Sequence, residues 1–179
     1  GERRNAEMMR WGLIPSWAKD IEIGNRLINA RSETLMEKPS FKNAFNKRRC
    51  LVLADGFYEW QKNAGPRGRS QPYYFKLANN KPFAFAGLWE FWRSKEGMEI
   101  RSCTIITCEA NELVRPVHER MPVMLTDDDL WAWLGESTPQ DLQPLLRPYA
   151  PDLMQRHPVA PLVNRPEVDS PELVLPVAV

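Results

Sequence analysis

A single carboxylate, Glu59, lies among aromatic residues in the stretch Phe57-Tyr58-Glu59-Trp60. Burying a charged carboxylate beside aromatic rings is costly unless the group is paired, hydrogen-bonded or protonated. A carboxyl group whose pKa is raised in this way is suited to proton transfer. The alternative is that Glu59 is an exposed residue of an alternating strand. Because Phe57 would then share its face, that alternative requires Phe57 to be half exposed.

His118 is the second candidate for acid-base chemistry, and it is one of only two histidines in the sequence. It lies in a polar bend over residues 115–122, between an expected helix and an expected strand. Bends of this kind often hold general acids and bases, although a solvent-exposed loop histidine is an equally open interpretation. His157 precedes a proline in an extended tail, and we assign it to structure.

Asn29 and Arg31 are separated by one residue, so in an extended segment their side chains point the same way. The amide can orient a polar substrate while the planar guanidinium binds a phosphate. The alternative is an edge-strand pair that forms a surface salt bridge.

Basic and aromatic residues alternate in the first part of the chain. Trp17 follows a Pro-Ser pair and is expected in a loop, where its ring can stack on a base, while Lys38 and its basic neighbours can neutralise phosphates. Lys and Arg outnumber Asp and Glu over residues 1–70, and the reverse holds over 71–179. This asymmetry favours a basic surface that binds an acidic partner.

Several classes of site have no support in the sequence. It contains no P-loop, no dinucleotide-binding glycine motif and no zinc motif, so we expect neither a cofactor nor a metal. The three cysteines, Cys50, Cys103 and Cys108, fall in apolar, strand-like runs without zinc-ligand spacing. We interpret them as buried structural thiols in a reducing compartment.

The elements that must position these residues are mainly strands. β-Branched and aromatic runs predict strands over 49–54, 72–77, 82–88 and 101–107, with a hairpin turn at Asn79-Asn80 and a flexible basic loop over 64–70. Thr126 is expected to cap a helix that ends at Gly135, and residues 173–175 to form a last strand. We predict one α+β domain over residues 1–179, with a predominantly antiparallel, barrel-like sheet and a few short peripheral helices.

Five ordered motifs together resemble the SOS-response-associated peptidase (SRAP) family, and the resemblance covers essentially the whole chain. The motifs are residues 11–17 (WGLIPSW), 29–34 (NARSET), 49–60 (RCLVLADGFYEW), 86–90 (AGLWE) and 118–123 (HERMPV). The resemblance implies a sensor of abasic sites in single-stranded DNA. In that family an amino-terminal cysteine closes a thiazolidine ring on the opened sugar, and a thiol autopeptidase activity accompanies this crosslinking.

Roles follow from the resemblance by motif matching. Asn29 matches a residue that positions the opened sugar or the terminal cysteine, Glu59 one that transfers protons, and His118 one that assists sugar opening. Schiff-base formation requires the loss of water from a carbinolamine, so a carboxyl group that exchanges protons near neutral pH fits the role of Glu59.

The resemblance also implies a DNA-binding set. Arg31 and Arg120 match positions that hold phosphates, Trp17 matches an aromatic residue that stacks near the lesion, and Lys38 belongs to the same basic region. We expect a monomer that binds abasic single-stranded DNA in the bacterial cytoplasm or nucleoid, without membrane attachment or secretion.

One departure from the family is the absence of a Met-Cys-Gly-Arg start, so we expect an amino-terminally incomplete chain that cannot itself form the crosslink. Two other functions stay open. The first is a noncatalytic module that binds single-stranded DNA. The second, a cysteine protease that acts on other proteins, is disfavoured because no cysteine has a suitable setting beside His118.

Overall fold

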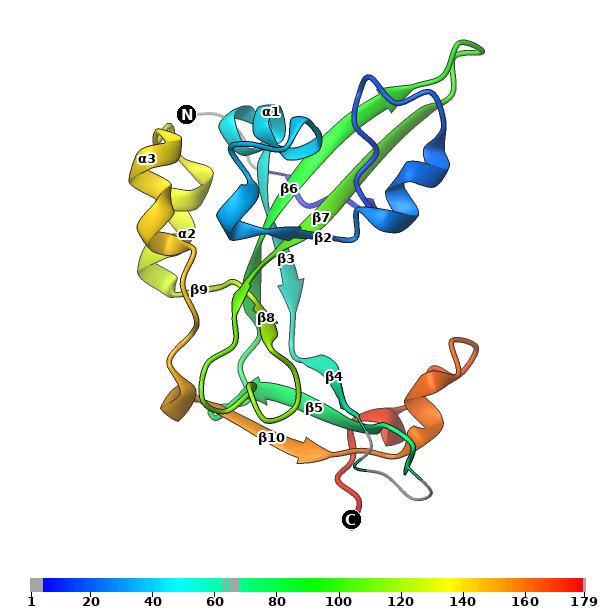
Figure 1. Cartoon of the computed structure of the whole chain (residues 1–179), viewed down its shortest axis with the longest axis vertical. Coiled ribbons are helices and arrows are strands. Elements are labelled where there is room, and N and C mark those ends of the chain that lie inside the picture. Colours follow the sequence, from blue (N-terminus) through cyan, green and yellow to red (C-terminus); the bar gives the residue numbers. More distant parts are fainter. Residues whose placement is uncertain (1–4, 63, 65–67, 179) are drawn as a thin grey trace.

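Two β-sheets form the framework of the chain, and the computed structural model describes residues 5–62, 64 and 68–178 (Figure 1). The larger sheet has the path β1-β7-β6-β3, with β2 and β8 paired to β7 and β9 paired to β6; the smaller has the order β10-β5-β4. The larger sheet comprises β1 (Arg10–Trp11), β2 (Asn29–Arg31), β3 (Arg49–Ala54), β6 (Phe83–Arg93), β7 (Glu99–Glu109), β8 (Arg120–Pro122) and β9 (Met124–Leu125). The smaller comprises β4 (Phe57–Gln61), β5 (Gln71–Leu77) and β10 (Met154–Pro158).

The α+β class and the single domain are confirmed, whereas the barrel is not. Most strand pairs are antiparallel, but β1 and β2 run parallel to β7, so the larger sheet is mixed. Within the part of the chain that the structure describes, the strands form two separate sheets and no closed barrel. The predicted strands over 49–54, 72–77, 82–88 and 101–107 correspond to β3, β5, β6 and β7.

The dipeptide Asp55-Gly56 carries the chain from one sheet to the other, because β3 pairs with β6 while β4 pairs with β5. Figure 1 shows β3 continuing downwards into β4 across this junction. A Cβ atom on Gly56 would lie 2.2 Å from Cζ of Tyr74, so any side chain there would force the ring or the backbone to move. The Tyr74 hydroxyl also donates a hydrogen bond to Asp55. The junction fixes where β4, and therefore Glu59, begins.

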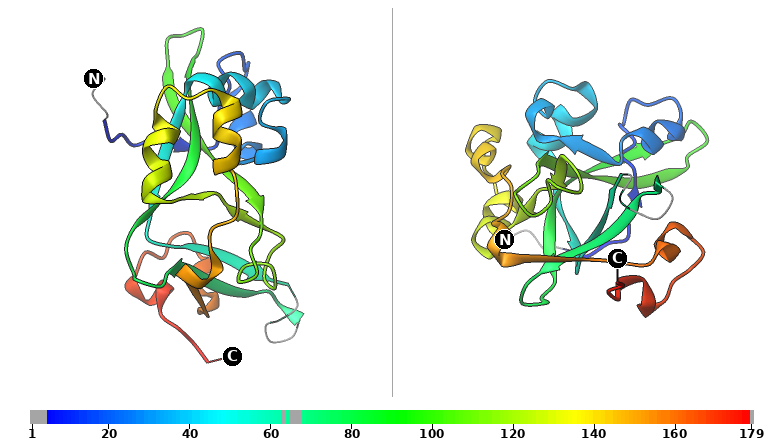
Figure 2. Two further views of the ribbon diagram at one scale, coloured as in Figure 1. Left: turned by 90° about the vertical axis from the view of Figure 1, so that its left-hand side faces the viewer. Right: turned by 60° about the horizontal axis from the view of Figure 1, so that its bottom comes forward.

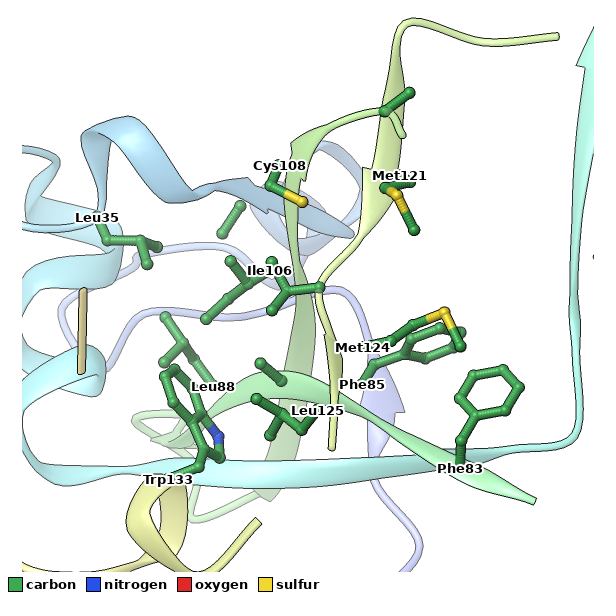
Figure 3. Packing of buried hydrophobic residues seen from close by; sticks show 14 of the residues in the cluster. Leu35, Phe83, Phe85, Leu88, Ile106, Cys108, Met121, Met124, Leu125 and Trp133 are labelled. Carbon is green, nitrogen blue, oxygen red and sulfur yellow. The ribbon is translucent and has the colours of Figure 1, made fainter. Parts of the chain in front are cut away.

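The core lies under the helices on one face of the larger sheet and extends to β5 and β10 of the smaller sheet. Leu88, Ile106 and Met121 from β6, β7 and β8 are fully buried there with Leu35 and with Trp133 of helix α2 (Asp127–Leu134) (Figure 3). Burial of apolar side chains of this size supplies the main stabilising free energy of a fold. The core thus fixes the strands whose opposite face carries the predicted polar residues.

Short helices complete the structure. The α-helices are α1 (Pro39–Lys47), α2 (Asp127–Leu134) and α3 (Pro139–Leu142). The 3-10 helices are η1 (Ile21–Arg26), η2 (Ser32–Thr34), η4 (Gln143–Leu145), η5 (Pro151–Leu153), η6 (Pro161–Asn164) and η7 (Pro171–Val174). In both views of Figure 2, α2 and α3 (yellow) lie apart from the C-terminal segment (red). None of the helices in the described residues is long and apolar enough to cross a bilayer.

Arg49 ties two of these helices together at their C-terminal ends. Its guanidinium donates hydrogen bonds to carbonyl oxygens at the ends of α1 and α2; the acceptors are Phe45, Asn46, Trp133 and Gly135. Carbonyls at helix ends have no partner within the helix, so a cation there satisfies them and interacts favourably with both helix dipoles. The predicted Thr126 cap and the end at Gly135 are confirmed.

Two sequence predictions are wrong and one is only partly tested. Asn79-Asn80 forms a turn in which Asn80 has a φ of 57°, but β5 and β6 belong to different sheets, so it closes no hairpin. Leu173 and Val174 belong to the 3-10 helix η7 instead of a strand. Of the basic loop expected over 64–70, residues 65–67 lie outside the described residues.

Candidate active site

One face of the larger sheet carries the predicted polar residues because its opposite face is the core. Ala30, Ile106 and Met121 are fully buried. Their neighbours Asn29 and Arg31 therefore point to the other face, as predicted from their spacing, and both are exposed. Thr107 pairs with Arg31 in β2 and with Pro122 in β8. This register places Asn29, Arg31, Thr107 and Arg120 on one face.

Glu59 and His118 meet although they come from different elements. Nδ1 of His118, in the bend before β8, lies 4.0 Å from Oε1 of Glu59 on β4, and the Glu59 side chain is only 23% exposed. Glu59 shares its face with Phe57, whose ring stacks on Phe75 in the core. Glu59 is therefore partly buried and not an exposed strand residue, although Phe57 is also only partly buried.

The surroundings of Glu59 favour its protonated form. Burial raises the pKa of Glu59 above its ordinary value, and the nearby His118 and a backbone hydrogen bond oppose this shift without cancelling it. Desolvation penalises the charged carboxylate more than the neutral acid. Glu59 is therefore a carboxyl group that can hold a proton beside an imidazole, which is the arrangement that acid-base catalysis uses.

His118 is held by the backbone of Arg120. The Arg120 N–H and the Arg120 carbonyl oxygen each lie 3.1 Å from Nδ1 of His118. The N–H can donate to a bare Nδ1, and the carbonyl can accept from a protonated Nδ1. The imidazole can therefore gain or lose a proton without losing its backbone partner.

Arg120 is itself anchored. Its guanidinium forms a two-pronged ion pair with Glu33 of η2, with N–O distances of 2.7 and 3.0 Å, and donates to the Thr107 carbonyl oxygen at 2.7 Å. These contacts hold the pKa of Glu33 below its ordinary value, chiefly through the hydrogen bond from Arg120. The chain of contacts Glu33–Arg120–His118–Glu59 links η2 to β4.

Other predicted site residues, namely Asn29, Lys38 and Trp17, lie outside this chain of contacts. Asn29 shares the sheet face with Arg120, but among the described residues it makes no hydrogen bond to Glu59 or His118. Lys38 is exposed at the N-cap of α1. Trp17 is 56% exposed, in a loop that Trp92 fixes by donating to the Ala18 carbonyl oxygen.

Trp17 also lines a cavity of about 410 Å³. The cavity is formed by the Trp17 loop and helix η1, and its lining comprises Trp17, Ala18, Lys19, Asp20, Glu22, Ile23 and Arg26. An exposed indole is suited to stacking on a flat ring, and the lining carries the basic Lys19 and Arg26 as well as the acidic Asp20 and Glu22.

The cysteines and the second histidine are placed as structural residues. Burial raises the pKa values of the Cys50 and Cys108 thiols to about 12, and that of Cys103 also rises. His157 lies with Nε2 2.8 Å from the Val174 carbonyl oxygen and so holds the C-terminal segment. The described residues contain no cluster of three or more His, Cys, Asp or Glu side chains able to hold a metal ion.

Glu33 and Thr107 were missed by reasoning from the sequence. Glu33 lies in the same motif as Asn29 and Arg31, so its place two residues after Arg31 was a usable signal. The register of β2, β7 and β8 that brings Thr107 to Arg120 depends on pairing between distant segments, which no local pattern reveals.

The chain is similar to characterised families over most of its length. The family described as SOS response associated peptidase (SRAP) matches residues 1–166. Abasic site processing protein YoqW of Bacillus subtilis is 48% identical over 97% of this chain and 78% of that protein. Abasic site processing protein HMCES of Rattus norvegicus is 36% identical over 94% of this chain, which spans 56% of the rat protein.

Solved structures agree with the sequence matches. A crystal structure of a protein from Bacteroides thetaiotaomicron has a TM-score of 0.88 with 29% identity, over 95% of this chain and 76% of that one. A second, from Bordetella bronchiseptica, has a TM-score of 0.75 with 32% identity, over 85% of this chain and 76% of that one. The family model covers residues 1–166, and the relatives match nearly the whole chain, so the chain belongs to the SOS response associated peptidase (SRAP) family.

Proposed function

We propose that the protein processes abasic sites in single-stranded DNA by forming a covalent link to the opened sugar, with Glu59 and His118 transferring protons. The observation that carries this proposal is the short distance, 4.0 Å, between His118 Nδ1 and a largely buried Glu59 carboxyl group. Relatives named abasic site processing proteins support the choice of substrate.

The chemistry requires protons to move at defined steps. A neutral amine adds to the sugar aldehyde and gives a carbinolamine, whose hydroxyl must be protonated before it leaves as water and the imine forms. A thiol then adds to the imine carbon and closes a thiazolidine ring, while the nitrogen takes up a proton. Glu59 in its acid form can donate to the leaving hydroxyl, and His118 can take up or return the proton.

The nucleophile in this proposal is an amino-terminal cysteine of the intact protein. Cys50, Cys103 and Cys108 are poor candidates because their thiols are held in the protonated form by burial. Removal of an initiator methionine by the associated autopeptidase activity would expose that cysteine. Mass spectrometry of the intact protein tests this step.

Residues around the centre would hold the DNA. We assign substrate orientation to Asn29, base stacking to Trp17, and phosphate binding to Arg31 and Lys38. Arg31 is exposed, and within the described residues it has no ion-pair partner, so its charge is accessible to a phosphate. Arg120 matches a further phosphate-binding position in the family, but its guanidinium is paired with Glu33.

The direct test incubates the intact protein, carrying an amino-terminal cysteine, with single-stranded DNA that bears one abasic site. We expect a product that survives denaturing electrophoresis and that Glu59→Gln and His118→Gln form more slowly. Glu99→Gln is the matched control because it removes a carboxylate that pairs with Arg93 in the β6–β7 hairpin. Salt-sensitive binding without a covalent product would instead support a noncatalytic single-stranded DNA-binding module.

A further inference from the structure

Arg120 contacts two parts of the site, one through its backbone and the other through its side chain. Its backbone gives His118 Nδ1 a donor and an acceptor, both at 3.1 Å. Its side chain reaches Glu33 and Thr107 at 2.7 Å each. Contacts that hold the Arg120 side chain in place therefore also hold the backbone atoms that orient the imidazole.

The Glu33 carboxylate occupies the guanidinium in the geometry that gives the strongest pairing. Oε1 and Oε2 of Glu33 accept from different terminal nitrogens of Arg120. Two parallel hydrogen bonds fix direction as well as distance, which a single point contact does not. Because η2 follows β2 directly, this pair also ties His118 to the strand that carries Asn29.

We infer that Glu33 is a positioning residue: by anchoring Arg120, it holds the backbone that orients His118 against Glu59. For its effect on activity this inference rests on the proposed function. Its effect on the His118 ring does not depend on any activity.

A direct phosphate contact by Arg120 is the competing role. The Arg120 side chain is 21% exposed, and both of its terminal nitrogens already have acceptors in Glu33 and Thr107. Among the described residues the buried Nε has no partner and Nη1 donates to Glu33 alone, so a phosphate could reach the free Nη1 hydrogen, but it would then lie beside the Glu33 carboxylate, which repels it. Arg31, which lies exposed on the same sheet face, has no such competitor among the described side chains.

The first experiment follows the imidazole resonances by NMR. The sequence has two histidines, so His157 serves as an internal reference in the same spectrum. In Glu33→Gln we expect the His118 ring nitrogen and proton resonances to shift and broaden while those of His157 stay in place. Glu99→Gln should change neither; its side chain is 44% exposed, close to the 49% of Glu33. Unchanged His118 resonances in a folded Glu33→Gln protein would overturn the inference.

The second experiment separates positioning from phosphate binding in the intact protein. In Glu33→Gln we expect crosslinking to slow by about 10- to 100-fold, the range that misplacement of a reacting group produces. DNA affinity should stay unchanged. In Arg120→Gln we expect the same slowing and an unchanged salt dependence of binding. Loss of one phosphate contact would instead make the slope of log affinity against log salt shallower by about 0.7.

The outcomes are distinguishable. Tighter DNA binding by Glu33→Gln, with a normal crosslinking rate, would make Glu33 a competitor of phosphate and contradict a positioning role. Failure of the unmodified protein to form any covalent product would overturn the proposed function, and the NMR comparison would still decide whether Glu33 positions His118.

Discussion

Nδ1 of His118 lies 4.0 Å from Oε1 of Glu59, and the two residues reach each other from different sheets. β4 supplies the carboxyl group, and the bend that leads into β8 supplies the imidazole. The His118 side chain is 44% exposed, whereas the Glu59 side chain is 23% exposed. A proton can therefore pass between the pair and a substrate that approaches from solvent.

The buried carboxyl group predicts a pH-dependent stability. Because burial raises the pKa of Glu59 in the folded chain, the folded state binds its proton more tightly than the unfolded state. The stabilisation is complete below the ordinary pKa and is lost as pH rises through the folded-state pKa. We expect Glu59→Gln to melt on the order of 2 °C above the unmodified protein at about pH 7 and equally at about pH 4. Calorimetry of both proteins at both pH values checks this. A Glu59→Gln variant that melts below the unmodified protein at the higher pH would contradict it.

The three cysteines are predicted to be unreactive in the native chain. Thiols with pKa values of about 12, as for Cys50 and Cys108, are almost entirely protonated at ordinary pH. We expect iodoacetamide at about pH 8 to modify the folded chain at least about 100-fold more slowly than the chain in denaturant. Peptide mass spectrometry locates the modified residues. Rapid native labelling at any of the three positions would reopen the search for an internal nucleophile.

Gly56→Ala should destabilise the junction that leads into Glu59. The added methyl group would lie 2.2 Å from Tyr74 Cζ, so the ring or the backbone must move. We expect a loss of about 1–3 kcal/mol in the free energy of unfolding, as for overpacked sites. The same change in a Tyr74→Ala background is the control, because the obstructing ring is then absent. Equal losses in both backgrounds would show that the clash is not the cause.

Local patterns predicted the strands well but not which strands pair. The runs that became β3 and β5 had the expected bounds within one residue, because β-branched and aromatic residues mark them directly. Asn79-Asn80 had the composition of a hairpin turn, yet the strands on either side enter different sheets. A turn sequence specifies a local bend, whereas the partner of each strand depends on distant segments.

The site residues show the same difference between local features, which were predictable, and contacts between distant segments, which were not. The shared direction of Asn29 and Arg31 follows from strand geometry and was predictable. The anchoring of Arg120 by Glu33 joins residues 87 positions apart and was not. The contact with Glu33, which most alters the interpretation of Arg120, could therefore be recognised only in the tertiary structure.

Arg49→Lys tests the link between the C-terminal ends of α1 and α2. The guanidinium donates to four carbonyl oxygens, which an ammonium group with three donors on a single atom cannot reach together. We expect a loss of about 1–3 kcal/mol in denaturant unfolding, since partly buried acceptors are left without partners. Arg147→Lys, at an exposed arginine that bonds Pro144 and Asp129, is the matched control and should cost less than about 1 kcal/mol.

Arg31→Ala should weaken binding of single-stranded DNA through loss of charge alone. Arg31 is exposed, and the described residues give it no ion pair to lose, so the fold should be unaffected. Neutralising one phosphate fewer should make the slope of log affinity against log salt shallower by about 0.7. Arg93→Ala removes another exposed arginine, from the β6–β7 hairpin, and serves as the control. Affinity measured across a salt series decides the point: parallel lines for Arg31→Ala and the unmodified protein would remove Arg31 from the DNA-binding surface.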